Sequence, residues 1–198
     1  MPLIQMDKQE FPEWAEVEFY QIERLKSDNP VYRKKTTPKE VMFVIEGESR
    51  FEFKDNKVSA KAGEHFKIIT NKYKIIPVSL PVTIVIIGGK WSSETGTRGV
   101  FELNRSISPK NSGDPVDYSR NTKFDNHFHD CDEYWIIVEG RGKAVSEGTV
   151  YQLAPGACIA TKRGDHHDIP RVEEPLNGVW FETTLYGKKR EGHLYHKV

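Results

Sequence analysis

The segment FDNHFHDCDEYW, residues 124–135, holds side chains whose types and spacing could do chemistry. His127 and His129 are two residues apart, and in a β-strand residues at that spacing point to the same face, so two imidazoles would enter one space. A His-x-His pair alone is also common on the polar face of a strand. Glu133 follows closely, and His166-His167 comes after Gly164 further along the chain. Together these residues favour a metal site over a polar turn.

This combination resembles the motifs of the cupin superfamily. The first cupin motif is His-x-His, three or four residues, Glu, six residues and Gly. The residues that match it, with the three-residue spacing, are His127, His129, Glu133 and Gly140. The resemblance is fairly specific to the superfamily, but it does not specify an activity within it.

The second cupin motif is roughly Pro-x-Gly-x-x-His, and here Gly164 and His167 match it. Lys162 stands where the motif has proline, and Arg171 stands where an asparagine often follows. These departures leave the metal ligands intact but leave the substrate of the pocket open. The resemblance implies one divalent transition metal inside a small antiparallel barrel, held by His127, His129, Glu133 and His167.

The chemistry of that ligand set agrees with the resemblance. Three neutral imidazoles and one carboxylate suit Fe, Mn, Zn, Ni, Co or Cu, and they do not suit Ca²⁺ or Mg²⁺. Four protein ligands leave one or two positions of the metal open, as in catalytic or ligand-capturing sites. Cys131 has the same parity as the two histidines and is a rival ligand, but the aspartates beside it predict a turn. His166 should face away from His167, and His193 and His196 are expected to be exposed.

The chain also contains an internal repeat. EVMFVIEG, residues 40–47, lies on EYWIIVEG, residues 133–140, when the chain is shifted by 93 positions, and Ala62-Gly63 then lies on Pro155-Gly156. Short runs of β-branched and aromatic residues recur between turn residues, which indicates an all-β protein. The segment 15–25 is ambiguous between strand and helix, and strand is preferred. With the resemblance, this predicts a bicupin, two double-stranded β-helix (jelly-roll-like) barrels in tandem.

The predicted boundaries are a degenerate, metal-free cupin barrel over 15–90, a linker with an edge strand over 91–123, a metal-binding barrel over 124–187 and a C-terminal tail over 188–198. In the first copy the shift of 93 places Lys34, Thr36 and Lys74 on the three histidines and Glu40 on Glu133. An ammonium group cannot bind a metal, but it can pair with a buried carboxylate. We therefore expect a lysine beside Glu40 instead of a metal.

The pocket and its activity follow from the resemblance only in outline. Trp135 shares parity with Glu133 and could form the floor of a substrate pocket, to which Arg171 is a second candidate. Glu182 is a candidate general acid or base if burial raises its pKa. The first hypothesis is an isomerase or epimerase acting on a small oxygen-rich metabolite such as a sugar, uronate or keto acid. The alternatives are an Fe(II) dioxygenase and a non-catalytic small-ligand-binding or sensor protein.

Composition limits the other partners. The 198 residues contain 29 Lys and Arg and 29 Asp and Glu, so there is no overall basic field for nucleic acid or an anionic membrane. The basic run Lys188-Lys189-Arg190 is expected to be a solvated turn. No apolar run is long enough to span a membrane, no signal peptide is visible, and two cysteines make no disulfide framework. These features predict a cytoplasmic protein, and the strand edges that need covering predict a homodimer.

Overall fold

The computed structural model describes residues 2–54, 56–187 and 189–194. The described residues form fourteen β-strands and no helix, which confirms the all-β prediction. None of them therefore belongs to a helix that could cross a membrane. The chain divides into two compact units, Glu16–Trp91 and a second that joins Met1–Ala15 to Ser92–Val198. We call them the N-terminal unit and the C-terminal unit.

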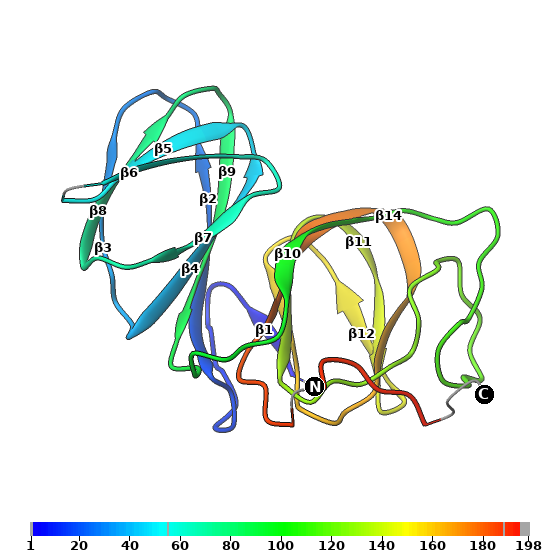
Figure 1. The fold of residues 1–198 in the computed structure, drawn as a ribbon. Helices are drawn as coiled ribbons and strands as arrows, with labels where there is room; N and C mark the ends of the chain where they lie inside the picture. The colour runs from blue at the N-terminus through cyan, green and yellow to red at the C-terminus, as the bar shows by residue number, and fades with distance from the viewer. Residues whose placement is uncertain (1, 55, 188, 195–198) are drawn as a thin grey trace. The chain divides into compact units, whose positions relative to one another are not determined.

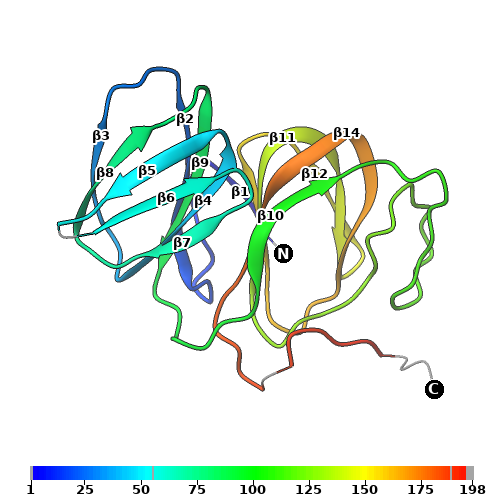
Figure 2. The same cartoon turned by 45° about the horizontal axis from the view of Figure 1, so that its top comes forward.

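The N-terminal unit contains two four-stranded antiparallel sheets (Figures 1 and 2). Their orders are β2-β9-β4-β7 and β3-β8-β5-β6. The ambiguous segment 15–25 is a strand, as preferred. The core between the sheets is apolar and includes Met42, Phe51, Ile75 and Ile84. The strand bounds are β2 Val17–Leu25, β3 Val31–Lys34, β4 Lys39–Glu46, β5 Glu48–Glu52, β6 Lys57–Lys61, β7 His65–Ile68, β8 Lys72–Pro77 and β9 Val82–Gly89.

The C-terminal unit is built on one sheet of order β1-β13-β11-β14-β10, with β12 paired to β11 (Figure 1). Register shifts interrupt the pairing of its two long strands and bend them. The first residues of β11 pair with β13 and its last residues pair with β12. The residues 92–123 belong to this unit, and β10 within them pairs with β14 along its whole length. The strand bounds are β1 Leu3–Gln5, β10 Arg98–Leu103, β11 Glu133–Ser146, β12 Thr149–Leu153, β13 Ala157–Thr161 and β14 His167–Glu182.

The strand pairing agrees with the shift of 93 residues at several positions. Glu40 pairs with Ile68 between β4 and β7, and Glu133 pairs with Thr161 between β11 and β13. Glu133 lies 93 residues after Glu40, and Thr161 lies 93 residues after Ile68. The turn glycines agree, because Gly47 and Gly140, and likewise Gly63 and Gly156, all have φ between 76° and 89°. Side chains other than glycine rarely adopt that conformation, so the same turns recur in both units.

The shift becomes 94 residues before β8, and this changes which side chains correspond. Six steps lead from Thr161 to His167, but only five lead from Ile68 to Tyr73. The bridge between His127 and His167 then corresponds to the pair Arg33 and Tyr73 of β3 and β8. This places one extra residue after Arg33, because seven steps lead from Arg33 to Glu40 and six from His127 to Glu133. Because strand side chains alternate between faces, one missing residue exchanges the inward and outward sets. Tyr73 is accordingly buried, while Lys74 lies on the other face.

Candidate metal centre

Four residues from separate parts of the C-terminal unit meet in a buried cluster. Glu133 begins β11 and His167 begins β14, and these two strands are neighbours in the sheet. The segment with His127 and His129 is anchored to β14 by an antiparallel bridge, with hydrogen bonds of 3.3 and 2.9 Å between His127 and His167 backbones. All four side chains are buried, and one ligand atom of each lies within 4.8 Å of the others.

Backbone carbonyls fix the orientation of all three imidazoles. The Nδ1 atoms of His127 and His167 lie 3.0 and 2.9 Å from the carbonyl oxygens of Asp125 and Asp165. His129 Nδ1 makes the same kind of contact with the Arg190 carbonyl oxygen. A carbonyl can only accept, so each Nδ1 must carry the proton, and in the neutral ring the Nε2 atom then presents a lone pair. This is the arrangement in which histidine ligands are held by outer partners.

The lone pairs that result all point at one place. The Nε2 atoms of His127 and His129 are 3.0 Å apart, and Glu133 Oε2 lies 3.0 Å from His129 Nε2 and 2.9 Å from His167 Nε2. Two donor atoms bound at right angles about 2.1 Å from one ion lie about 3.0 Å apart, which is the spacing found here. His167 Nε2 and Glu133 Oε2 have no hydrogen-bond partner although both are buried. The four residues therefore fit a divalent transition metal.

The electrostatics of the cluster point the same way. Burial lowers the pKa of His127, and the neighbouring His167 and His129 lower it further. Burial opposes ionisation of Glu133, but His129 and His167 outweigh it and hold the Glu133 pKa well below its usual range. Burial also opposes a charge on His129, yet Glu133 raises the pKa of that ring. The ionised carboxylate of Glu133 thus favours a positive charge beside it, while burial and mutual repulsion disfavour protonating several of the imidazoles. One divalent cation would supply the positive charge and leave the imidazoles neutral.

The cluster opens into a cavity of about 330 Å³ whose walls combine aromatic and charged groups. Trp135, the predicted pocket floor, and Glu182, the candidate acid or base, line it. Arg171 does not, because it is an exposed residue on the outer face of β14 and is absent from the lining. The structure therefore corrects the sequence-based assignment of Arg171 to the pocket. The aromatic walls are formed by Phe101, Phe124, Trp135 and Trp180.

Glu182 is a buried carboxylate at the edge of this cavity, with 1% of its surface exposed. Thr97 donates to it twice, from the backbone nitrogen at 2.6 Å and from the hydroxyl at 2.9 Å. Burial raises the pKa of Glu182, the charge of Glu133 raises it further, and the hydrogen bonds from Thr97 offset part of that rise. A carboxyl group whose pKa is raised and that lines a cleft is a candidate for proton transfer.

The rival ligands of the sequence lie outside the four-residue cluster. Cys131 is buried, but its Sγ atom lies 4.0 Å from Glu182 Oε2, and burial raises the pKa of the thiol. His166 faces away from the centre, as expected, and contacts Asp114 at 2.9 Å. His193 is only partly exposed and its Nε2 lies 3.1 Å from Glu191 Oε1. His196 lies outside the described residues.

Sequence reasoning missed the role of residues 189–194, which it treated as an exposed tail. Arg190 and Glu191 line the cavity, and Gly192 forms a bridge with Phe128 inside the His-x-His segment. Arg190 Nε lies 3.7 Å from Glu182 Oε1. No motif or apolar pattern marks this segment, because its contacts are made mainly by backbone atoms and a carbonyl carries no sequence signal.

The corresponding region of the N-terminal unit corrects the predicted lysine pair. Glu40 is buried as expected, but it accepts hydrogen bonds from the Thr36 backbone nitrogen at 2.6 Å and from the Thr36 hydroxyl at 3.3 Å. Among the described residues Lys74 pairs instead with Glu52 at 3.6 Å, and Lys34 is exposed. The prediction failed because the shift of 93 does not hold at either lysine: one extra residue follows Arg33, and one residue is missing before Tyr73.

The residues that replace the histidines are Arg33, Thr36 and Tyr73. Arg33 is paired with the buried Glu23, to which Gln21 also donates. Burial raises the pKa of Tyr73 and the charge of Glu40 raises it further. A guanidinium, a hydroxyl and a phenol do not form a transition-metal site, and both candidate metal clusters found among the described residues lie in the C-terminal unit.

Comparisons with known proteins agree with this fold and add little about activity. No family model matches the chain. A curated relative, "Uncharacterized protein y4oW" of Sinorhizobium fredii (strain NBRC 101917 / NGR234), is 44% identical over 112 residues, which are 57% of this chain and 52% of that protein. The chain thus spans about half the length of the curated relative it matches.

Solved structures are similar over most of the chain at low sequence identity. A Bacillus subtilis oxalate decarboxylase studied for its Mn(II) centres has a TM-score of 0.65 at 9% identity, covering 97% of this chain and 74% of that one. AerE from Microcystis aeruginosa has a TM-score of 0.58 at 11% identity, covering 83% and 86%. At these identities the likeness establishes the fold alone. The chain has the cupin fold, with a buried group of histidines and a glutamate that could hold a metal.

Proposed function

We propose that this protein is a metal-dependent isomerase or epimerase that moves a proton between carbons of a small, oxygen-rich and uncharged metabolite. One observation carries the proposal: Glu182, a buried carboxyl with a raised pKa, lies on the wall of the cavity into which the His127, His129, Glu133 and His167 cluster opens. A proton-transfer group beside a site for a Lewis acid is what such a reaction needs.

The metal would be held by His127, His129, Glu133 and His167. When bound, it would polarise a substrate carbonyl and lower the cost of the negative charge that develops on that oxygen. The carbonyl partners of the three Nδ1 atoms keep the imidazoles oriented throughout the reaction.

Glu182 supplies the proton transfer. In its ionised form it takes the proton from the carbon next to the carbonyl. In an isomerisation the resulting acid returns this proton to the former carbonyl carbon, while the hydroxyl proton of the first carbon moves to the former carbonyl oxygen. In an epimerisation the proton returns to the same carbon on its opposite face. No other reactant is consumed, so atoms and electrons balance. The two donors from Thr97 hold the carboxylate in place, and burial raises its pKa.

The cavity walls favour an uncharged substrate over a dianion. Arg190 is the one guanidinium among the described lining residues, and it faces five carboxylates of the same lining. Even with a divalent ion the lining keeps a negative balance, so a small dianion would be repelled. The aromatic walls can instead stack on the face of a sugar ring. The five carboxylates belong to Glu102, Asp125, Glu133, Glu182 and Glu191.

The test is exchange of substrate hydrogen with solvent. The metal-loaded protein would be incubated in D₂O with a panel of neutral aldoses and ketoses, uronates and keto acids, and deuterium at carbon would be followed by NMR. We expect exchange with neutral sugars, and a loss of about 10²- to 10⁴-fold in Glu182→Gln. Oxygen uptake without exchange would favour the Fe(II) dioxygenase, and tight binding without either would favour a non-catalytic sensor.

We also propose that the two units are two cupin barrels in tandem, of which the N-terminal one is metal-free. Glu40 pairs with Ile68 as Glu133 pairs with Thr161, and this supports an origin of the two units by duplication. A homodimer remains part of the proposal, since Val78 and Leu80 in the N-terminal unit expose about half of their surfaces (55% and 49%). A cytoplasmic setting is supported by Cys131 and Cys158, which are both buried and unpaired.

A further inference from the structure

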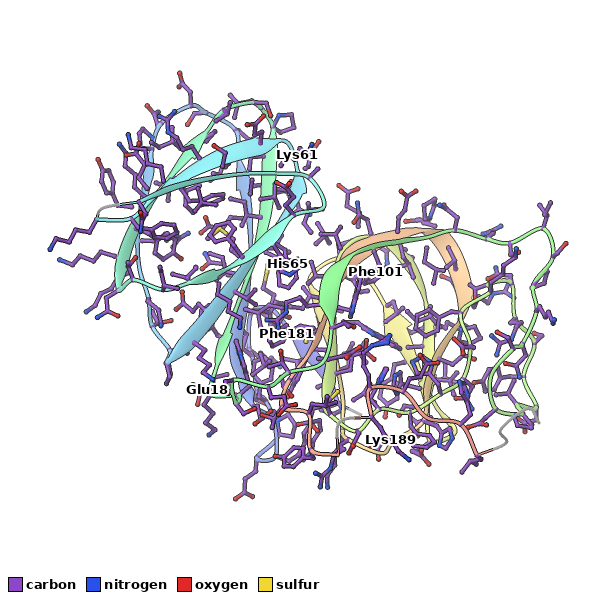
Figure 3. The ribbon with its side chains drawn as sticks, in the orientation of Figure 1. Glu18, Lys61, His65, Phe101, Phe181 and Lys189 are labelled. Atoms are coloured by element: carbon purple, nitrogen blue, oxygen red, sulfur yellow. The ribbon has the colours of Figure 1, made fainter. Side chains whose placement is uncertain are left out.

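The segment 189–194 forms the outer edge of the His-x-His segment. The Asp130 backbone nitrogen donates to the Lys189 carbonyl at 3.2 Å, and Phe128 and Gly192 exchange two backbone hydrogen bonds of 3.2 and 2.8 Å. On its other edge the His-x-His segment has the bridge between His127 and His167. The two metal-facing histidines are therefore held between β14 and the segment 189–194. Figure 3 labels Lys189 on this segment, which runs past the strands of its own unit.

A buried carboxylate anchors the far end of the segment. Asp114 is 2% exposed, and both of its oxygens lie 2.9 Å from the Leu194 backbone nitrogen. His166 also contacts Asp114, at 2.9 Å. A charged acceptor strengthens a hydrogen bond to a backbone nitrogen, so the anchor is stronger than an ordinary backbone pair.

The segment 189–194 supplies the carbonyl that orients His129, and this contact differs from those that orient His127 and His167. His127 and His167 each donate Nδ1–H to a carbonyl two residues earlier, at Asp125 and Asp165, so local backbone alone orients these rings. The acceptor for His129 is the Arg190 carbonyl, 61 residues away in the chain. The orientation of His129 therefore depends on whether the segment 189–194 is in place.

We propose that the segment 189–194 is a working part of the metal centre and that Arg190 is a positioning residue. Its carbonyl holds His129 in the tautomer and rotation that present Nε2 to the metal, and Asp114 keeps that carbonyl in position. Without the segment, His129 Nδ1–H loses its acceptor and the ring is free to turn away from the other three ligands. The inference rests on the proposed metal binding by His127, His129, Glu133 and His167.

The experiment compares the retention of Co²⁺, whose visible spectrum reports the ligands around it. One variant ends at Gly187, and its matched control ends at Leu194 and so removes only residues 195–198. A second pair acts on the anchor: Asp114→Ala removes the acceptor for Leu194, while Asp114→Asn keeps one acceptor oxygen. Lys189→Ala leaves the backbone of the segment in place and serves as a surface control. Each protein is loaded with Co²⁺ and its affinity is measured by competition with a chelator.

Loss of one outer partner of a metal-binding histidine typically costs about 10- to 100-fold in affinity. We expect a loss in that range for the chain ending at Gly187, with a changed Co²⁺ spectrum, and a smaller loss for Asp114→Ala that Asp114→Asn partly restores. The control ending at Leu194 and Lys189→Ala should match the whole chain within twofold. Thermal unfolding without metal separates positioning from general damage, since positioning predicts the spectral change at a nearly unchanged midpoint.

Two results would overturn the inference in distinguishable ways. If the whole chain binds no Co²⁺, the proposed metal site itself is wrong. If the whole chain binds Co²⁺ and the chain ending at Gly187 binds it equally well with the same spectrum, only the role of the segment is wrong. Should that truncated chain fail to fold, equal affinity and spectrum in Asp114→Ala and the whole chain would refute the role instead.

Discussion

The repeat provides a matched pair of substitutions, Glu133→Gln and Glu40→Gln, that replace equivalent buried carboxylates in the two units. Each change keeps the shape of the side chain and removes its charge. Glu133 is the one anionic member of the four-residue cluster, whereas Glu40 accepts hydrogen bonds from Thr36 and Thr37. The two variants should therefore fail in different ways.

The magnitudes follow from those contacts. Removing an outer partner of a metal ligand costs about 10- to 100-fold in affinity, so loss of the anionic ligand itself should cost at least about 100-fold. For Glu40→Gln, hydrogen bonds to a charged acceptor contribute about 1.5–3 kcal/mol and neutral ones about 0.5–1.5 kcal/mol, so the variant should lose about 1 kcal/mol. In a chain of this size that corresponds to about 2–4 °C in the unfolding midpoint.

The assay is elemental analysis after dialysis, combined with thermal unfolding. The parent and Glu40→Gln should each hold one divalent transition metal per chain, and Glu133→Gln should hold almost none. Glu40→Gln should show the lowered midpoint while it keeps the metal content of the parent. Two metals in the parent, or equal metal loss in both variants, would refute the assignment of a single site to the C-terminal unit. Metal retained by Glu133→Gln would refute the four-ligand cluster.

Three further predictions concern other parts of the molecule. Since burial and the charge of Glu133 raise the pKa of Glu182, its contribution to stability is complete below the unfolded pKa and is lost as the pH rises through the folded value. Glu182→Gln should thus gain stability relative to the parent as the pH rises, and equal pH profiles in thermal melts would contradict this. Arg33→Met should destabilise the protein by about 3–5 kcal/mol because it leaves buried Glu23 unpaired, with metal content unchanged. Light scattering should give twice the chain mass of 22.8 kDa, and a monomer at tens of micromolar would exclude the homodimer.

The sequence by itself determined the fold class and the four ligand candidates. Alternation in a strand made the parity of His127 and His129 visible, and the match of residues 40–47 with residues 133–140 indicated a repeat. These signals are local, because strand pleating puts side chains two residues apart on one face whatever the rest of the chain does. The clustering of Glu133 and His167 with the first two histidines then followed from the resemblance to cupins, and the structure brings the four together.

Only the tertiary structure decided which distant backbone and side-chain atoms complete the site. One residue more between Arg33 and Glu40, and one fewer before β8, moved the correspondence from Lys34 and Lys74 to Arg33 and Tyr73. Register of this kind is visible only when strands are paired. Arg190 reaches His129 through a carbonyl oxygen, an atom that every residue has, so no side-chain pattern could reveal it. Arg171 was a candidate pocket residue from its place in a motif, but it is exposed, next to a register shift between β11 and β14. Burial, register and backbone contacts are properties of the folded chain and not of any segment of it.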